Sequence, residues 1–370
     1  MKKLKFIWII AFIILFSCNN KSGINNEPRF IKIVMDEQAP QNLWMKDYGD
    51  LNGNSKTDII VGGQQSGGIV AYLAPDWEKQ LINDTLSIGT DAQVCDLDND
   101  GIQDILLIVR DALIWLKGPH WDFNHIDSMQ LHDVQVADFN NDGMLDIVAR
   151  NQAEFSNRID SVLYFYIQSP AGEWTKYTHP IVNGEGIKIA DINKNGRPDI
   201  IINGYWLENT GNIRYWLKHK FTDTWKWRNT FIDFADLNDD GKPDIVYSPA
   251  ELAGQYYRIS WFEQPEDPTL KWQEHIIADS VEAVVHSIGA ADINLNGKMD
   301  IVTADMKQGA YPQEVAVYYN LGNNNWEKEV ISNEGSHSMI LYDFDVDGDI
   351  DIVGGNHQEN ILKMWINQTK

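Results

Sequence analysis

The chain has 370 residues, with 30 lysines and arginines against 54 aspartates and glutamates, and its formal charge at pH 7 is −24. This excess of negative charge argues against binding to nucleic acid or to an anionic membrane face. The only cysteines are Cys18 and Cys95, which excludes a framework of several disulfides.

The N-terminus has the pattern of an export signal. Three lysines precede an apolar run over residues 6–16, which is too short to span a bilayer and suits a signal peptide. The run ends in Leu15-Phe16-Ser17-Cys18, which resembles a bacterial lipobox. We therefore expect a signal peptide over 1–18, a lipidated Cys18 and a flexible spacer over 19–28. The protein would then be exported and held at the bacterial outer membrane, on the periplasmic or the cell-surface side, with its acyl chains as the only membrane contact. An ordinary secretory signal or a short anchor is the alternative.

From residue 47 onward one acidic pattern recurs about every 50 residues. It has aspartate at positions 1 and 9, a carboxylate or amide at positions 3 and 5, and glycine at position 6 in six of seven copies. The first aspartates of the copies are Asp50, Asp96, Asp138, Asp191, Asp236, Asp292 and Asp343. Seven similar units without a linker predict one closed repeat domain.

Each repeat contains four short strand-like runs. In the second repeat they cover residues 92–95, 104–108, 113–116 and 121–126, and the last of them begins at a tryptophan. Similar outer runs begin at Trp77, Trp272 and Trp326, whereas in the fourth repeat residues 215–216 and 225–227 both qualify. Third-strand aromatics such as Trp115 recur once per repeat, which is typical of packing between neighbouring units.

The last repeat lacks an outer strand, because the chain ends soon after its third run, residues 361–366. Residues 29–34 have the character of the missing strand. We therefore predict an all-β fold over 29–370, a monomeric seven-bladed β-propeller with four-stranded blades. The N-terminal strand closes the ring, and the acidic loops connect first and second strands.

The acidic loops carry oxygen donors at the spacing of a calcium loop, and glycine permits its sharp turn. We predict several structural Ca²⁺ ions, bound best where four aspartates are present, at the loops of Asp96 and Asp343. Loop 1 departs most, because Ser55 replaces the glycine. A solvated acidic turn without metal and a single catalytic calcium are the alternatives. The predicted ligands are Asp50, Asn52, Asn54, Asp58, Asp96, Asp98, Asp100, Asp104, Asp138, Asn140, Asp142, Asp146, Asp191, Asn193, Asn195, Asp199, Asp236, Asn238, Asp240, Asp244, Asp292, Asn294, Asn296, Asp300, Asp343, Asp345, Asp347 and Asp351.

These loops, followed by Ile-Val-like strands, resemble FG-GAP/VCBS repeats, which build calcium-bearing propellers including those of integrin α-subunits. Residues 132–138 and 203–209 also resemble bacterial propellers similar to the propeller domain of aldos-2-ulose dehydratase. The cupin-like domains of that enzyme have no counterpart in this sequence.

Polar residues recur six positions before each first aspartate, about 20 Å away along the inner strand. They are Trp44, Thr90, His132, Glu185, Thr230, His286 and His337. The second strands return to the same end and bring Arg150, Asn151, Asn203, Tyr205, Trp206, Glu251, Asp305, Lys307 and His357. We expect these side chains, with an exposed tryptophan among them, to converge at one axial mouth suited to a polar ligand such as a sugar.

Two functions are consistent with such a mouth. The first is β-elimination on a uronate-containing glycan or a keto-sugar. One of His132, His286 or His337 would abstract the proton, another histidine or Tyr205 would protonate the leaving oxygen, and Arg150, Lys307 or a bound metal would stabilise the enolate. The expected ligand-binding residues are Glu185, Asn203, Trp206, Glu251, Asp305 and His357. The second function is non-catalytic binding of a glycan or a protein at the cell surface.

Three further interpretations are consistent with the sequence. The three histidines, with or without Glu185, could hold one more divalent metal. They could instead only hydrogen-bond the backbone around the channel. The propeller could also be purely structural.

Overall fold

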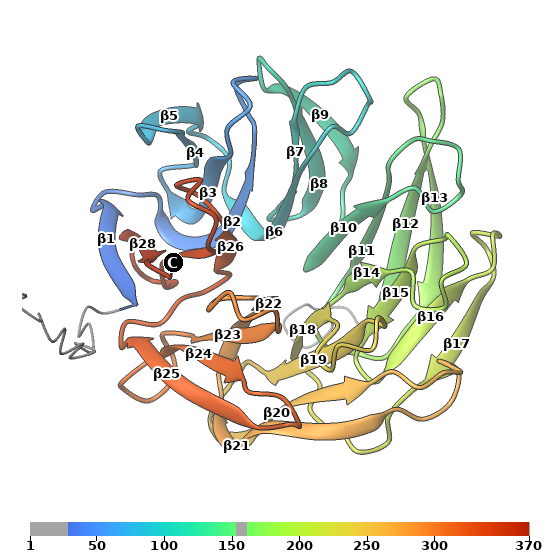
Figure 1. Ribbon diagram of the computed structural model, residues 1–370. Coiled ribbons are helices and arrows are strands. Elements are labelled where there is room, and N and C mark those ends of the chain that lie inside the picture. The colour runs from blue at the N-terminus through green and yellow to red at the C-terminus, as the bar shows by residue number, and fades with distance from the viewer. Residues whose placement is uncertain (1–28, 153–160, 370) are drawn as a thin grey trace, which may run out of the picture.

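The computed structural model describes residues 29–152 and 161–369, which form a ring of seven four-stranded antiparallel sheets (Figure 1). The described residues contain no helix, and accordingly none that could cross a membrane. The predicted all-β seven-bladed propeller is therefore confirmed. Cys18, the signal peptide and the spacer lie outside the described residues, so these assignments stay predictions.

In each blade the strands run outward from the axis in chain order, except that the outer strand of the seventh blade comes from the start of the ring's chain. The inner strands are β2 (Gln41–Gly49), β6 (Ile88–Cys95), β10 (Asp133–Ala137), β14 (Lys188–Ala190), β18 (Thr230–Ala235), β22 (Val285–Ala291) and β26 (Ile340–Tyr342). The second strands are β3 (Asp58–Ser66), β7 (Asp104–Val109), β11 (Asp146–Arg150), β15 (Asp199–Ile202), β19 (Asp244–Pro249), β23 (Asp300–Asp305) and β27 (Asp351–Gly354). Every second strand thus begins at the ninth-position aspartate of its loop.

The outer half of each blade consists of a third and a fourth strand. The third strands are β4 (Ile69–Leu73), β8 (Ala112–Lys117), β12 (Val162–Gln168), β16 (Tyr205–Asn209), β20 (Leu252–Glu263), β24 (Val315–Asn320) and β28 (Leu362–Asn367). The outer strands are β5 (Glu78–Asn83), β9 (Asp122–Asp127), β13 (Trp174–Pro180), β17 (Trp216–Lys220), β21 (Gln273–Ala283), β25 (Trp326–Ser332) and, from the start of the chain, β1 (Phe30–Asp36).

The ring is closed by β1, which pairs antiparallel with β28, Phe30 opposite Asn367. The predicted closure by the N-terminal strand is therefore confirmed. In the fourth blade the outer strand begins at Trp216, whereas Trp225 and Trp227 lie in the loop that follows. Their indole nitrogens donate to the Thr230 hydroxyl at 2.9 Å and to the Ala250 carbonyl at 2.9 Å, so this loop is tied to the fifth blade.

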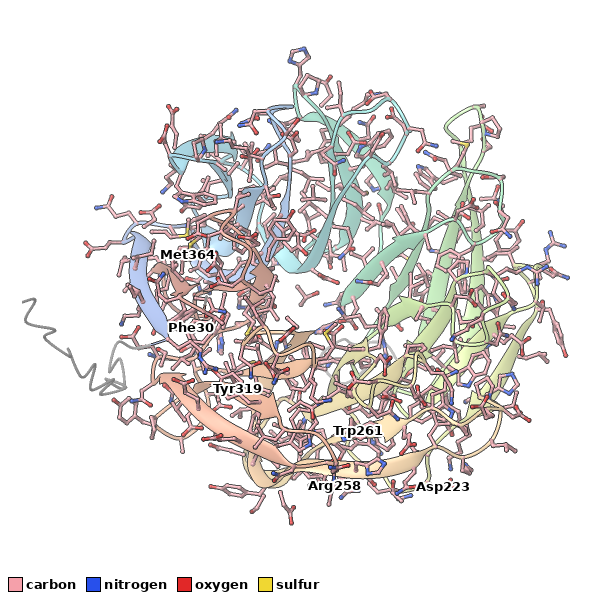
Figure 2. The ribbon with its side chains drawn as sticks, viewed as in Figure 1. Phe30, Asp223, Arg258, Trp261, Tyr319 and Met364 are labelled. Carbon is pink, nitrogen blue, oxygen red and sulfur yellow. The ribbon has the colours of Figure 1, made fainter. Side chains whose placement is uncertain are left out.

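The blades pack through apolar clusters that each span two neighbours. The aromatic residue of each third strand belongs to such a cluster, as when Tyr72 of blade 1 joins Met364 of blade 7. At the junction of blades 6 and 7, Phe30 belongs to the same cluster as Tyr319 (Figure 2). Cys95 is buried in one of these clusters, as expected for a small apolar side chain. Burial of these side chains is the main stabilising contribution across each junction.

The ninth-position aspartates are fully buried and clamp their blades. In blade 2 the two carboxylate oxygens of Asp104 accept hydrogen bonds from the backbone N–H groups of Leu97, at 3.0 Å, and of Gly118, at 2.8 Å. The equivalent aspartate makes the same pair of bonds in all seven blades. Position 9 therefore joins the acidic loop to the residue that ends or follows the third strand.

Candidate functional site

An axial cavity of about 650 Å³ lies at the end of the ring opposite the acidic loops. Six of the seven residues six positions before the first aspartates line it: Trp44, Thr90, His132, Glu185, His286 and His337. Glu251 and His357 reach it from the ends of second strands. The predicted convergence therefore holds for these eight residues, which come from all seven blades.

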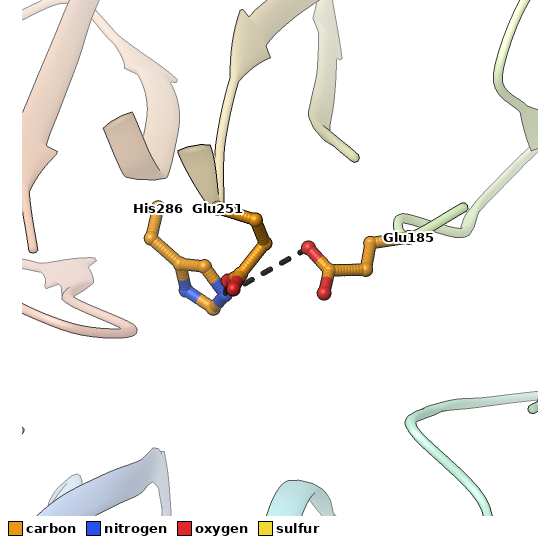
Figure 3. Close-up of side chains that lie close together, drawn as sticks. All are labelled: Glu185, Glu251 and His286. Carbon is orange, nitrogen blue, oxygen red and sulfur yellow. Dashed lines mark ion pairs between the residues drawn. The ribbon is translucent and has the colours of Figure 1, made fainter. Parts of the chain in front are cut away.

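Glu185, Glu251 and His286 lie close together on the cavity wall (Figure 3). One donor atom from each lies within 4.8 Å of the other two. The His286 Nε2 atom is 2.9 Å from a Glu251 carboxylate oxygen and 4.0 Å from Oε2 of Glu185. Glu185 is fully buried, and burial raises the pKa of its carboxyl well above the ordinary value.

His132 lies between two carboxylates. Its Nε2 is 3.3 Å from Oε1 of Glu185, and its Nδ1 is 3.2 Å from Oδ1 of Asp133. Burial alone would lower the pKa of His132, but the two negative charges outweigh it and raise the pKa to about 9. The amide of Gln152 donates to the same Glu185 oxygen.

His337 is fixed by its backbone surroundings. Its Nδ1 lies 3.1 Å from the Trp44 carbonyl oxygen and 2.9 Å from the Ser338 hydroxyl. Because a carbonyl oxygen only accepts, the bond to Trp44 requires the hydrogen on Nδ1 and leaves Nε2 with a lone pair. The ring stacks on His286 at 4.1 Å between centroids and lies nearly parallel to the Trp44 ring at 5.7 Å. Burial and the neighbouring His286 hold the pKa of His337 well below its usual range.

A second cavity of about 190 Å³ continues toward the loop end of the channel and shares Thr90, His132 and His286 with the first. Its charged lining comprises Lys46, Asp47, Asp91, Asp133 and Lys188. The three aspartates also cross blade junctions, because each accepts a hydrogen bond from a backbone N–H of the next blade: Val94, Val134 and Gly186.

Several residues predicted for the mouth do not line the cavity. Arg150 is fully buried, and its guanidinium donates to the carbonyls of Gly186, at 2.7 Å, and Val182, at 3.1 Å. Tyr205 lies under the ammonium of Lys218, 3.8 Å from the ring centroid.

Trp206, one of the expected ligand-binding residues, does not reach the cavity. Trp206 is fully buried, stacks on His219 at 4.3 Å and donates to the Pro268 carbonyl.

The other predicted residues that do not line the cavity form hydrogen bonds or ion pairs elsewhere at the same end of the ring. The Asn203 amide donates to the Arg228 carbonyl at 2.6 Å, Asp305 accepts from the Glu314 N–H, and the Lys307 ammonium pairs with Glu359 at 2.7 Å. Thr230 and Asn151 are buried away from the cavity lining. The position along a strand identifies the end of the blade, but both faces of a blade pack against neighbouring blades, so a side chain at that end can be buried between blades instead of reaching the axis.

Arg110 and Gln64 line the cavity and are absent from the sequence-based prediction. Each follows a ninth-position aspartate by six residues, as His357 and Gln152 also do. The position six residues after a ninth-position aspartate therefore indicates residues that line the cavity.

Two acidic loops bring their carboxylates together as a cation would require. The donor oxygens of Asp96, Asp98 and Asp104 converge within 4.8 Å, and so do those of Asp343, Asp345 and Asp347. Within the described ranges these are the only loops with three convergent carboxylates, and they are the two that carry four aspartates. Hard oxygen donors of this kind suit Ca²⁺. In loop 2 the ammonium of Lys117 pairs with Asp98 and, at 3.0 Å, with Asp100, so a cation there would compete with it. Calcium binding stays a prediction.

Comparison with known proteins supports the fold. Residues 138–202 match the family of FG-GAP-like repeats. A search of curated protein sequences gives no significant match. A lectin of Agrocybe aegerita that recognises non-reducing terminal N-acetylglucosamine has a similar structure, with 15% identity, a TM-score of 0.56 and coverage of 89% of this chain and 86% of the lectin.

Two further solved structures have a similar fold. A rhamnogalacturonan lyase of Bacillus licheniformis shares 13% identity at a TM-score of 0.51, over 92% of this chain and 76% of the lyase. BBS1N, solved in complex with ARL6DN, shares 8% identity at a TM-score of 0.57, over 92% of this chain and 97% of its own. At such identities the likeness concerns the fold alone. The narrower resemblance to aldos-2-ulose dehydratase stays a prediction.

Proposed function

We propose that this seven-bladed β-propeller, in which residues 138–202 form an FG-GAP-like repeat, binds an acidic glycan in its axial cavity and cleaves it by β-elimination. The observation that carries the proposal is the convergence of four histidines, Arg110 and two glutamates on one cavity of about 650 Å³. A volume of this size is ordinary for a small-ligand site. The protein would act outside the cytoplasm as a lipoprotein stiffened by calcium.

The substrate class follows from the chemistry of elimination. A base removes the hydrogen on the carbon next to the carboxylate of a uronate residue. The electron pair forms a carbon–carbon double bond as the bond to the glycosidic oxygen breaks, and that oxygen takes up a proton. The products are a shortened glycan and an unsaturated sugar, and the step consumes no other reactant.

His337 is the proposed base, because its Nδ1 is bonded to the Trp44 carbonyl and its Nε2 lone pair is available for the proton. His132 is the proposed proton donor to the leaving oxygen, since it lines the cavity from blade 3. Arg110 replaces Arg150 and Lys307 as the cation that neutralises the substrate carboxylate, because it lines the cavity and they do not.

The test is ultraviolet absorbance during incubation of the protein with a panel of uronate polysaccharides and keto-sugars, because elimination creates a conjugated product. We expect turnover in the wild type and a loss of about 100-fold or more in His337→Ala. The matched control His125→Ala alters an exposed histidine on β9 and should leave the rate unchanged. A flat trace across the panel, or full activity in His337→Ala, would contradict elimination.

A second candidate function is binding without catalysis. It is favoured by the Trp44 ring, which lines the cavity nearly parallel to His337 and could stack on a sugar. The similar Agrocybe aegerita fold belongs to a sugar-recognising lectin. Saturable glycan binding without product, weakened by Trp44→Ala, would identify this function.

A further inference from the structure

Glu185 is a buried acidic residue on the wall of the axial cavity. Its side chain is fully buried, and Oε2 has no hydrogen-bond partner within the described residues. Its other oxygen accepts the Gln152 amide and faces His132 at 3.3 Å. A buried carboxylate oxygen without a hydrogen-bond partner is strongly unfavourable. A ligand bound on that side would therefore stabilise the site.

The free oxygen points toward two other donors. Oε2 of Glu185 lies 4.0 Å from Nε2 of His286, which is itself 2.9 Å from Glu251 (Figure 3). The side chain of His286 is 5% exposed, and that of Glu251 is 15% exposed. Ligand atoms about 2.0–2.2 Å from a tetrahedral zinc ion lie about 3.4 Å apart, and the two observed separations bracket that value. Small side-chain movements would therefore complete a coordination triangle.

We propose that Glu185, Glu251 and His286 bind one divalent first-row transition ion, such as Zn²⁺ or Mn²⁺, on the wall of the axial cavity. One imidazole and two carboxylates form a mixed nitrogen and oxygen set that suits these ions, whereas Ca²⁺ prefers oxygen alone. His132 and His337 are not ligands in this site, in contrast to the three-histidine set that is one of the alternatives consistent with the sequence.

Three protein ligands leave coordination positions open, and all three residues line the cavity. A carboxylate or carbonyl oxygen of a bound molecule could occupy one of them. The site does not depend on the proposed elimination, because its test measures the ion and not a product.

The test uses full-length protein stripped with chelator and then titrated calorimetrically with Zn²⁺ or Mn²⁺ in excess Ca²⁺, which fills any calcium loops. We expect one equivalent to bind to the wild type, and binding to weaken at least ~100-fold in Glu185→Gln. Glu173→Gln, at an exposed position on the loop before β13, is the matched control and should bind as the wild type does.

Because Glu185 is buried, folding of the variant is checked by circular dichroism. If it does not fold, Glu251→Gln and His286→Ala provide the same comparison. The ion should also raise the melting temperature of the wild type and not that of a folded ligand variant. No binding to the wild type, equal binding in all the ligand variants, or full competition by Ca²⁺ would overturn the proposal.

Discussion

Asp91 shows how a single carboxylate in the narrow part of the channel can make stability depend on pH. Its oxygens accept hydrogen bonds from the Val134 N–H of the next blade and from Ala92, both at 2.9 Å. Burial and the nearby negative charge of Asp133 raise the pKa of Asp91 to about 7. Besides Asp133, the charged or titratable groups facing the same cavity are Lys46, Asp47, Lys188, His132 and His286.

The sign of the effect follows from the direction of the pKa shift. Between its ordinary pKa near 4 and about 7, Asp91 holds a proton in the folded protein and loses it on unfolding. Its contribution to the free energy of unfolding is therefore fully present below about pH 4 and is lost as the pH rises through 7. We expect Asp91→Asn to flatten the fall in stability between pH 5 and pH 8 by on the order of 2 kcal/mol.

The measurement is the melting temperature of wild type and variant at both pH values with calcium present. Asp122→Asn, at an exposed position on β9, serves as the control. An identical pH dependence in wild type and Asp91→Asn would contradict this role for Asp91.

Residue roles were predictable only where the register alone determines them. His132, His286 and His337 reach the cavity because inner strands crowd around the axis and each histidine occupies the same register. Trp206 and Arg150 lie at the correct end of the ring but are buried away from the cavity, and their burial depends on partners far away in sequence, such as the Pro268 carbonyl. Glu185 was placed correctly, but its pairing with Glu251 and His286 depends on the curvature of the ring, which no local pattern encodes.

At the scale of the secondary-structure element, the acidic loop is one motif repeated seven times. Position 1 accepts hydrogen bonds from the backbone at positions 5 and 6, as Asp96 does from Asp100 and Gly101. Position 6 is left-handed in every copy, which explains the glycine: at Gly101 φ is 86°. Position 4 is left-handed as well, including Val346 at 63°. The sequence did not predict this feature, because Asn, Lys, Leu and Val all occupy the position.

Calcium should stabilise these loops. Binding to the folded state at 100 times its dissociation constant would add about 2.7 kcal/mol per site. We expect a chelator to lower the melting temperature, and Asp345→Asn to shift the calcium midpoint upward, because loop 7 loses one of its convergent carboxylates. Asn54→Ser in loop 1, which lacks the glycine, should change the midpoint little. A melting temperature indifferent to chelator would show that the loops are not calcium sites.

At the scale of the whole molecule, seven blades and their closure were predictable because the period and the missing last strand are both visible in the sequence. The pairing that closes the ring also predicts which end of the propeller faces the tether. Phe30 lies opposite Asn367, whose N–H donates to Asp351 at the acidic-loop end. A tether attached ahead of Phe30 would therefore leave from that end, and the axial cavity would open away from the membrane.

Lipidation at Cys18 is the premise of that orientation and can be tested directly. We expect the wild type to partition into the detergent phase, because its acyl chains are apolar, and Cys18→Ser to remain in the aqueous phase. Cys95→Ser alters the buried cysteine of β6 and should partition as the wild type does. Detergent partitioning of Cys18→Ser would rule out the lipid anchor, and protease accessibility on intact cells would distinguish the two sides of the outer membrane.

The seventh blade, which combines β1 with β26, β27 and β28, also determines when the ring can close during synthesis. Its outer strand is made before every other strand of the ring and its other three strands after them, so β1 has no partner until β28 has been made. Because β1 pairs only with β28, the ring cannot be completed on a partly synthesised chain. The entropic cost of closing this long loop is only slightly larger than that of a shorter one, because the cost grows with the logarithm of loop length. Until β28 has been made, β1 remains an open strand edge, which makes early release or truncation of the chain a route to aggregation.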